Sequence, residues 1–228
     1  MQRLWIYGAG GHGAVVAHVA QRTGAFEIGG FWDDDKTRRG EQYCGLTIMG
    51  GLERILRRTK DLEIKYIILA IGDNSVREQL AKSLPAVHFP RIIDPTAVVG
   101  KGVKIDVGTV VMPGAVLEPF AHIGRHCIVN NHAVVGHNVS VGDFCHVGGG
   151  AIVSGQCTVG RGTLIGINAC IIQNLHIGQY CRIGAGAVVL KNLPDNTTAL
   201  GNPARIITNF SKNHQSVSGV IQNQHHEN

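Results

Sequence analysis

Residues 121–147 read AHIGRHCIVNNHAVVGHNVSVGDFCHV, and an aliphatic side chain recurs in this stretch at every sixth position. The same spacing continues in both directions without interruption. The sixteen positions are Val99, Ile105, Val111, Leu117, Ile123, Val129, Val135, Val141, Val147, Val153, Val159, Ile165, Ile171, Ile177, Ile183 and Val189. Neither the helical period of about 3.6 residues nor the strand period of about 2 gives this spacing, so the pattern is an internal repeat. A six-residue repeat predicts a parallel β-helix.

A second column of residues lies two positions before the first, and its members are all small or apolar. Four of them are cysteines, Cys127, Cys145, Cys157 and Cys181. We expect these thiols to pack inside the prism rather than form disulfides or a nucleophile. Glycine often follows the aliphatic residue directly, at a corner that needs either a positive φ or the absence of a Cβ. Each hexad should therefore supply one short strand and one turn.

This pattern resembles the left-handed β-helix of hexapeptide acyltransferases, in which three hexads form one triangular coil of eighteen residues. The resemblance implies about five coils. Since the repeat begins only near Ala97, we expect a first domain at 1–94 and the β-helix at 95–207. Residues 208–228 are rich in Asn, Gln, Ser and His, which predicts a flexible polar tail.

Composition narrows the functional classes. The formal charge is +5, but the Lys and Arg residues are dispersed and lack a set of stacking aromatics, which argues against nucleic acid. A small polyanionic ligand or a merely solvated basic surface would explain the excess. Cysteine use fits a reducing compartment, and neither a signal peptide nor a membrane-spanning apolar run is recognisable. We expect a soluble, cytoplasmic protein that binds no membrane.

The first ninety residues alternate strands and helices, which predicts a small Rossmann-like α/β domain. Expected strands at 3–7, 27–32 and 65–71 precede, respectively, the turn GAGGHG at 8–13, a run of aspartates and Gly72. Expected helices span 14–21 and 75–84, the second capped by Asn74 or Ser75.

The carboxyl ends of these parallel strands should form one crevice that contains the glycine turn, Asp33, Asp34 and Gly72. Glycines let the backbone approach a phosphate, and a helix N-terminus supplies N–H donors. The domain is half the usual length of a dinucleotide fold. We therefore consider a nucleotide-linked substrate, a redox dinucleotide and a purely structural turn.

Six histidines lie on the repeat outside the inward columns: His122, His126, His132, His137, His146 and His176. The spacing of His132 and His137 is similar to that of two zinc ligands in γ-class carbonic anhydrases, but the third ligand position falls on Thr96. In a second interpretation, one imidazole is the general base of acyl transfer. Gly155 follows His137 by eighteen residues, so its N–H should lie above that imidazole, where it could stabilise a carbonyl oxygen.

The chain as a whole resembles the sugar acetyltransferases of the bacillosamine/perosamine N-acetyltransferase and sialic acid O-acetyltransferase group. The resemblance covers about residues 3 to 207. It rests on GAGGHG at 8–13, the Trp32-Asp33-Asp34 strand end, AIGDN at 70–74, GHN at 136–138, GIN at 166–168 and GNPAR at 201–205.

The resemblance implies where substrates bind. A nucleotide-activated amino-sugar would lie on the first domain, and acetyl-CoA would lie between neighbouring subunits of a homotrimer. The implied sugar-nucleotide residues are Gly10, Gly11 and His12 at the phosphates or sugar, Asp33 and Asp34 at the base or ribose, Gly72 in the same crevice, and Asn130. The implied acetyl-CoA residues are His146, Ile167 and Ala185, with Arg205 available to a CoA phosphate.

His137 falls on the family's catalytic base position, and one departure follows it directly. Bacillosamine-type enzymes carry an acidic residue after this histidine, whereas here the residue is Asn138. Asparagine can orient an imidazole but cannot stabilise imidazolium with a charge. Either Asp143 or Glu118 takes that role, or a weaker base suffices, which leaves the acceptor group open.

The function expected from these residues is metal-free N-acetyl transfer from acetyl-CoA to the amine of a nucleotide-linked 4-amino-deoxy-sugar. A UDP-linked bacillosamine-type sugar is favoured, and a GDP-perosamine type is the alternative. His137 would remove the amine proton during direct attack, and the Gly155 N–H would stabilise the oxyanion. The competing functions are sugar O-acetylation of the sialic acid type and a non-catalytic scaffold that binds nucleotide sugars.

Overall fold

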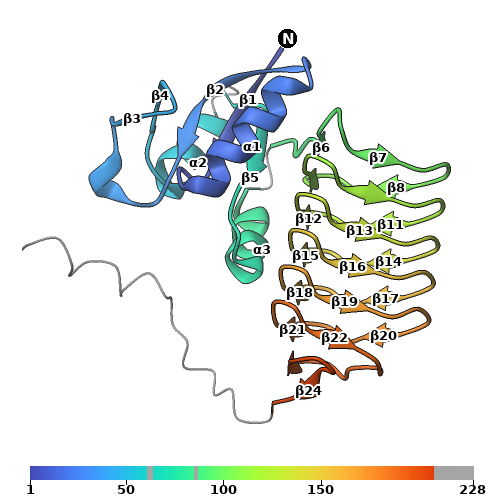
Figure 1. Cartoon of the computed structure of the whole chain (residues 1–228). Coiled ribbons are helices and arrows are strands. Elements are labelled where there is room, and N and C mark those ends of the chain that lie inside the picture. Colours follow the sequence, from blue (N-terminus) through green and yellow to red (C-terminus); the bar gives the residue numbers. More distant parts are fainter. Residues whose placement is uncertain (61–63, 85–86, 208–228) are drawn as a thin grey trace, which may run out of the picture.

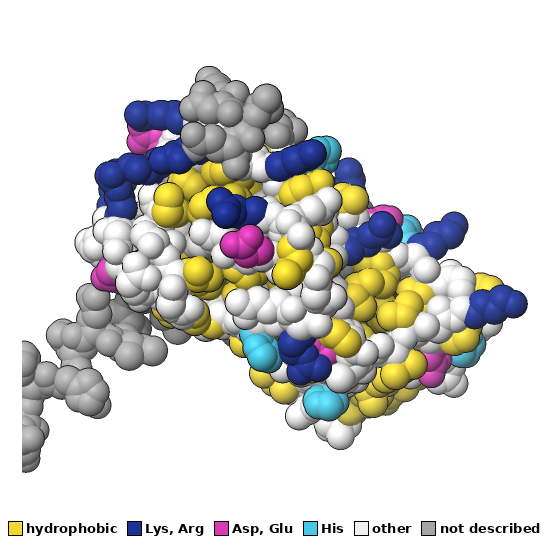
Figure 2. Space-filling model, turned by 90° about the horizontal axis from the view of Figure 1, so that it is seen from above, with side chains coloured by type: hydrophobic (Ala, Val, Ile, Leu, Met, Phe, Trp, Pro, Cys, Tyr) yellow, Lys and Arg dark blue, Asp and Glu magenta, His cyan; other side chains and the backbone are white. Residues whose placement is uncertain are grey.

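The computed structural model describes residues 1–60, 64–84 and 87–207, which form an α/β domain beside a triangular β-helix (Figure 1). The tail expected at 208–228 lies outside the described residues. Within the described ranges, no helix is both long and apolar enough to cross a membrane. Lys and Arg side chains are spread over both domains on the face seen from above (Figure 2).

Every hexad forms a two-residue strand, and strands eighteen residues apart pair in parallel, as in Val116 with Val134. The first face of the prism contains β7 (Val98–Val99), β10 (Val116–Leu117), β13 (Val134–Val135), β16 (Ile152–Val153), β19 (Cys170–Ile171) and β22 (Val188–Val189). The second contains β8 (Lys104–Ile105), β11 (His122–Ile123), β14 (Ser140–Val141), β17 (Thr158–Val159) and β20 (His176–Ile177). The third contains β6 (Ile92–Ile93), β9 (Val110–Val111), β12 (Ile128–Val129), β15 (His146–Val147), β18 (Leu164–Ile165), β21 (Arg182–Ile183), β23 (Thr198–Leu200) and the antiparallel β24 (Arg205–Ile206).

The two sequence columns fill the prism interior. The aliphatic column is buried from Ile105 onward, while Val99, in the open first coil, is 43% exposed. The four column cysteines are free and buried. Each Sγ approaches a corner carbonyl, as in Cys127 Sγ to Gly142 O at 3.1 Å. The expected packing role of these thiols is confirmed.

The corners use glycine in two different ways. The glycine after each aliphatic residue has an ordinary φ, but a Cβ on Gly136 would lie 2.7 Å from Gly155 N of the next coil. That position therefore needs the absence of a Cβ. The positive φ occurs two residues later, for example +57° at Asn138 and +55° at Asn168. Asparagine tolerates this left-handed conformation better than most residues, which is a structural reason for Asn138.

The α/β domain has a three-stranded parallel sheet of order β2-β1-β5. Its elements are β1 (Gln2–Tyr7), α1 (Gly11–Arg22), β2 (Phe26–Trp32), a 3-10 turn (Lys36–Arg38), β3 (Gln42–Tyr43), β4 (Leu46–Thr47), α2 (Leu52–Lys60), β5 (Tyr66–Leu69) and α3 (Asn74–Ser83). The β3–β4 hairpin and α2 had no sequence prediction. The expected cap of the last helix was wrong, because the Asp73 carboxylate accepts from the N–H groups of Ser75 and Val76 and so starts the helix earlier.

The two domains share a hydrophobic contact. Val110 and Met112 of the β-helix are buried in the same cluster as Val16 and Val19 of α1. The strand β6 already pairs with β9, so β-helix hydrogen bonding begins at Ile92, slightly before the expected boundary at 94. As a result the α/β domain lies against the third face of the prism, as Figure 1 shows.

Candidate active site

The glycine turn between β1 and α1 is both required by packing and open to a ligand. A Cβ on Gly8, where φ is +111°, would lie 2.6 Å from Ala70 O, and one on Gly13 would lie 1.9 Å from Gly8 O. Gly10 and Gly11, in contrast, face open space. The turn therefore exposes its backbone and the α1 N-terminus, an arrangement suited to a phosphate.

The two aspartates after β2 brace this turn. Asp33 accepts from Ala9 N at 2.8 Å, and Asp34 accepts from the Tyr7 hydroxyl at 2.9 Å and from Leu52 N at 2.8 Å. Burial and the bond to Asp34 raise the pKa of Tyr7, so it remains a donor. Their contact with a base or ribose stays a prediction, but both carboxylates have an internal role that sequence analysis missed.

A cavity of about 380 Å³ opens beside Asp34. Four cationic residues line it: Lys36, Arg39, Arg54 and Arg57. Two of them come from the loop after β2 and two from the helix α2, and the sequence had predicted none of the four. The cavity shares Asp34 with the predicted crevice, and its four cations outnumber its two carboxylates, Asp34 and Glu53, which suits a polyanionic ligand.

His12, Gly72, Asn130 and His146 converge where the α/β domain meets the third face. The Asn130 amide donates to His146 Nε2 at 3.3 Å. Burial, then the Arg77 cation, then His12 lower the pKa of His146 to about 4, and a hydrogen bond with the Gly72 backbone opposes this. Burial and Arg77 also lower the pKa of His12 to about 4. Both imidazoles are therefore neutral at physiological pH.

This cluster joins residues that the sequence assigned to different substrates. His12, Gly72 and Asn130 were expected at the nucleotide sugar, and His146 at acetyl-CoA. Nε2 of His12 is buried without a hydrogen-bond partner in the part of the chain that the structure describes. A buried, unpaired ring nitrogen in a crevice is available to a ligand.

His137 lies on the corner between the first and second faces, and its side chain is exposed. A Cβ on Gly155 would lie 2.4 Å from His137 Nε2 and 2.6 Å from Cε1, so the imidazole lies against the Gly155 backbone as the eighteen-residue count predicts. Glu118 accepts from the backbone N–H of His137 at 2.8 Å, not from its ring.

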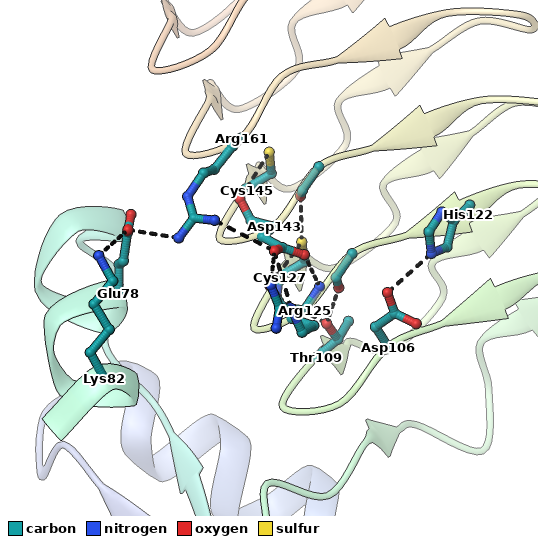
Figure 3. A network of polar contacts seen from close by, with 12 residues as sticks. Glu78, Lys82, Asp106, Thr109, His122, Arg125, Cys127, Asp143, Cys145 and Arg161 are labelled. Atoms are coloured by element: carbon teal, nitrogen blue, oxygen red, sulfur yellow. Dashed lines mark hydrogen bonds and ion pairs between the residues drawn. The ribbon is translucent and has the colours of Figure 1, made fainter. Parts of the chain in front are cut away.

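The Asp143 carboxylate also forms its contacts away from the His137 imidazole. It pairs with Arg125 at 2.8 Å and Arg161 at 3.6 Å on the corner between the second and third faces (Figure 3). These two cations hold the pKa of Asp143 below its usual value, although burial alone would raise it. Neither carboxylate considered from the sequence is therefore placed to support the His137 imidazole within this chain.

The corner that carries His137 is opposite the third face. In a triangular prism, the corner shared by two faces cannot touch the remaining face. Figure 1 accordingly shows the corner loops between the first two faces on the far side from the α/β domain. One chain therefore separates His137 and Gly155 from the crevice and from His146.

Ile167 and Ala185 lie on the remaining corner, between the third and first faces. They occupy successive coils, since Gly186 N donates to Ile167 O at 2.8 Å. The Ile167 side chain is 61% exposed. Arg205 lies in β24 at the end of the prism, and its side chain donates to Ala204 O at 3.3 Å. These exposed positions border the third face that carries His146.

The zinc interpretation gains no support from the geometry. His132 and His137 lie on successive corners of the prism. Within residues 1–60, 64–84 and 87–207, no group of three or more His, Cys, Asp or Glu side chains is arranged to hold a metal ion. Thr96 instead donates to Asp94 at 2.6 Å.

The repeat architecture defines a hexapeptide-repeat transferase, and comparisons with known proteins refine this class. The family model described as the PglD N-terminal domain matches residues 3–84, and the bacterial transferase hexapeptide model matches residues 156–191. The chain is 35% identical over 117 residues to a UDP-N-acetylbacillosamine N-acetyltransferase of Bacillus subtilis. That match covers 49% of this chain and 52% of the relative, about half its length.

Solved structures match over nearly the whole chain. A mutant of perosamine N-acetyltransferase from Caulobacter crescentus, in complex with CoA and GDP-perosamine, has a TM-score of 0.85 and 31% identity, covering 91% of this chain and 97% of that one. The acetyltransferase domain of PglB from Neisseria gonorrhoeae, in complex with acetyl coenzyme A, has a TM-score of 0.83 and 33% identity, covering 90% and 99%.

The chain belongs to the hexapeptide-repeat sugar N-acetyltransferase family. This confirms the expected fold class, an α/β N-terminal domain followed by a left-handed parallel β-helix. It also confirms, at the level of the family, an acetyl-CoA-dependent nucleotide-sugar acetyltransferase.

Proposed function

We propose that this protein transfers the acetyl group of acetyl-CoA to the amine of a nucleotide-linked 4-amino-deoxy-sugar, in the cytoplasm and as a homotrimer. The stacking of His137 against Gly155 is the observation that carries this proposal. It combines an exposed imidazole with a neighbouring backbone N–H, which are the base and the oxyanion donor that acyl transfer needs. The glycine turn and the cationic cavity beside Asp34 would hold the nucleotide sugar.

Trimer formation would resolve the separation between His137 and the crevice. The outward side chains of the first face form an apolar ladder of Val98, Val116, Val134, Ile152, Cys170 and Val188. Val98 is 59% and Ile152 42% exposed. The second face is polar by comparison, with Lys104, His122, Ser140, Thr158 and His176.

An exposed apolar ladder of this length is typical of a surface that another copy covers. Contact through the first face brings its edge corners, which carry His137 and Ile167, toward neighbouring copies. In this arrangement, His137 of one copy would face the crevice of the next. The site would then consist of a nucleotide-sugar crevice from one copy and a base from its neighbour.

The chemical step balances without an acyl-enzyme. The amine nitrogen attacks the thioester carbonyl carbon, the carbon–sulfur bond breaks, and CoA leaves as the thiolate. His137 takes the amine proton, and Gly155 N–H donates to the carbonyl oxygen while it carries negative charge. Asn138 contributes no charge to the imidazole, so we expect a base weaker than one with an acidic partner.

The first test is replacement of the base. His137→Ala should lower turnover by about 10² to 10⁴ while nucleotide-sugar binding is retained. Release of free CoA in a thiol assay measures the turnover, and isothermal calorimetry measures the binding. Wild-type turnover in this variant would refute the assignment. Absence of CoA release from the wild-type protein with every sugar would favour the scaffold.

The acceptor and the nucleotide need separate experiments. Assays with 4-amino and hydroxyl acceptors distinguish N-acetylation from O-acetylation. A thermal-shift screen of UDP, dTDP and GDP sugars identifies the nucleotide, because a ligand at about 100 times its Kd should stabilise the fold by about 2.7 kcal/mol. We expect the UDP sugar to give the largest shift. Equal shifts from all three would refute selection of the nucleotide by this domain.

A further inference from the structure

A single arginine connects the two walls of the candidate crevice. Arg77 of α3 is 1% exposed. Its guanidinium donates to Ile71 O at 2.7 Å and to Asn74 Oδ1 at 2.7 Å in its own domain. It also donates to three carbonyls of the β-helix, those of His126 at 2.8 Å, Phe144 at 3.0 Å and Cys145 at 3.3 Å. No ion pair joins it to a carboxylate of the described residues.

Two of the hydrogen bonds of Arg77 end directly beside residues of the candidate site. Ile71 immediately precedes Gly72, and Cys145 immediately precedes His146. The guanidinium therefore fixes the backbone next to one residue of the crevice loop and next to one residue of the third face. Arginine suits this task because its planar fork presents five donors in fixed directions.

We propose that Arg77 is a positioning residue, which holds the Ile71–Gly72 loop and the Cys145–His146 strand in a fixed relative position. His146, expected from the sequence at acetyl-CoA, lies instead beside His12 and Asn130, so Arg77 places it against the bound nucleotide sugar. This inference rests on the proposed function only for the identity of that ligand. Simple domain docking is a weaker explanation, since buried apolar side chains would join the domains without a buried cation. The Val110 and Met112 contact already does so.

A second effect of Arg77 is electrostatic. The charged and titratable groups around His146 are Arg77 from α3 and His12 from α1, and the Asn130 amide and Gly72 backbone complete its polar surroundings. After burial, the Arg77 cation is the largest cause that lowers the pKa of His146. Neutral His146 keeps Nε2 as an acceptor for the Asn130 amide, so the charge and the hydrogen bonds of Arg77 support the same geometry.

The structure offers a matched control on the same helix. Glu78 of α3 pairs with Arg161 of the β-helix at 2.7 Å and with Lys82 (Figure 3). Glu78→Gln therefore weakens another polar contact between the two domains without touching Ile71 or Cys145. Arg77→Lys keeps the charge but loses the fork, and Arg77→Met removes both. Comparison of these variants separates docking from positioning.

We expect Arg77→Met to lower kcat/KM for the nucleotide sugar by about 10² or more, with KM for acetyl-CoA changed less than threefold. Arg77→Lys should lose about tenfold, and Glu78→Gln less than threefold. NMR titration of the His146 ring should show its pKa rising in Arg77→Met and staying low in Arg77→Lys. This titration needs no substrate, so it remains informative if the proposed function fails.

Two results would overturn the inference. The first is an equal loss of activity in Arg77→Met and Glu78→Gln at equal melting temperature, which would reduce Arg77 to a docking contact. The second is an unchanged His146 titration in Arg77→Met. If Arg77→Met does not fold, Arg77→Lys decides, since wild-type kcat/KM in that variant would show that the fork geometry is not required.

Discussion

The substitution Gly155→Ala tests whether the position of His137 matters to the reaction. A Cβ at this position would lie 2.4 Å from His137 Nε2, 2.6 Å from Cε1 and 2.9 Å from Cδ2. Ordinary contact begins at 3.4 Å, so the imidazole must move by about 1 Å. His137 is exposed, and its ring can swing away without moving the backbone.

The expected effect therefore falls on activity rather than stability. Displacement of a reacting group by about 1 Å can cost about 10²-fold in rate, and we expect kcat to fall by this factor. The new methyl group leaves the Gly155 N–H in place, so a lost oxyanion donor would not explain the change. The melting temperature should shift by no more than a few degrees, because loss of glycine also lowers the entropy of the unfolded chain.

A double-mutant cycle with His137→Ala provides the control. If the methyl group acts only by displacing the imidazole, Gly155→Ala should have no further effect in the His137→Ala background. Stopped-flow or thiol-release assays of the four proteins supply the rates. Wild-type kcat in Gly155→Ala, or an equal loss in both backgrounds, would show that the methyl group does not act by displacing the imidazole.

Three further predictions concern the crevice, the assembly and acid stability. Gly10→Val should preserve the melting temperature, because Gly10 is extended at φ −96° and faces open space. The new side chain would fill the space proposed for the phosphate, so nucleotide-sugar binding in calorimetry should be abolished. Retained binding would contradict a phosphate at this turn. On the first face, Ile152→Asp should convert the proposed trimer to monomers in light scattering and lower activity at least tenfold. On the second face, Thr158→Asp should leave the trimer intact. Monomers from both variants would contradict the first face as the interface. Burial, the first cause, lowers the pKa of His12, His126 and His146 to about 4 from 6.5, so the unfolded state binds protons first and stability falls between pH 6.5 and 4. Each histidine contributes about 1.4 kcal/mol per pH unit near pH 5 to the dependence of the free energy of unfolding on pH. Urea unfolding at several pH values should show that this dependence is smaller by about a third in His126→Asn. An unchanged pH dependence would contradict burial as the cause.

The sequence predicted the β-helix well because its structure is local and periodic. Each hexad brings its own strand, inward side chain and corner, and the register follows by counting, so Gly155 could be placed against His137 without a structure. The corner chemistry was only partly predictable. Gly136 and Asn138 satisfy different constraints, steric and torsional, and the sequence alone does not separate them.

The contacts between domains could not be predicted in this way. Arg77 reads as an ordinary surface residue of an amphipathic helix, and only the docking of α3 onto the corner of His126 and Phe144 buries it. Asp34 likewise reads as a ligand contact, but it caps α2, whose apolar residues Leu52, Ile55 and Leu56 follow helical spacing among charged neighbours. Residues far apart in the chain meet where the two domains contact each other, and no local sequence spacing predicts that they lie close together.

In the proposed trimer, one copy supplies the crevice and its neighbour supplies the base. Coexpression of His137→Ala and Gly10→Val chains with different tags, followed by purification through both tags, tests it directly. Each variant alone should be inactive. Purification through both tags removes the two homotrimers, and in either mixed trimer about one third of the sites would combine an intact crevice with an intact His137. We predict recovery of about this fraction of the wild-type turnover per site. Mixed trimers as inactive as either parent would contradict a site shared between neighbouring copies.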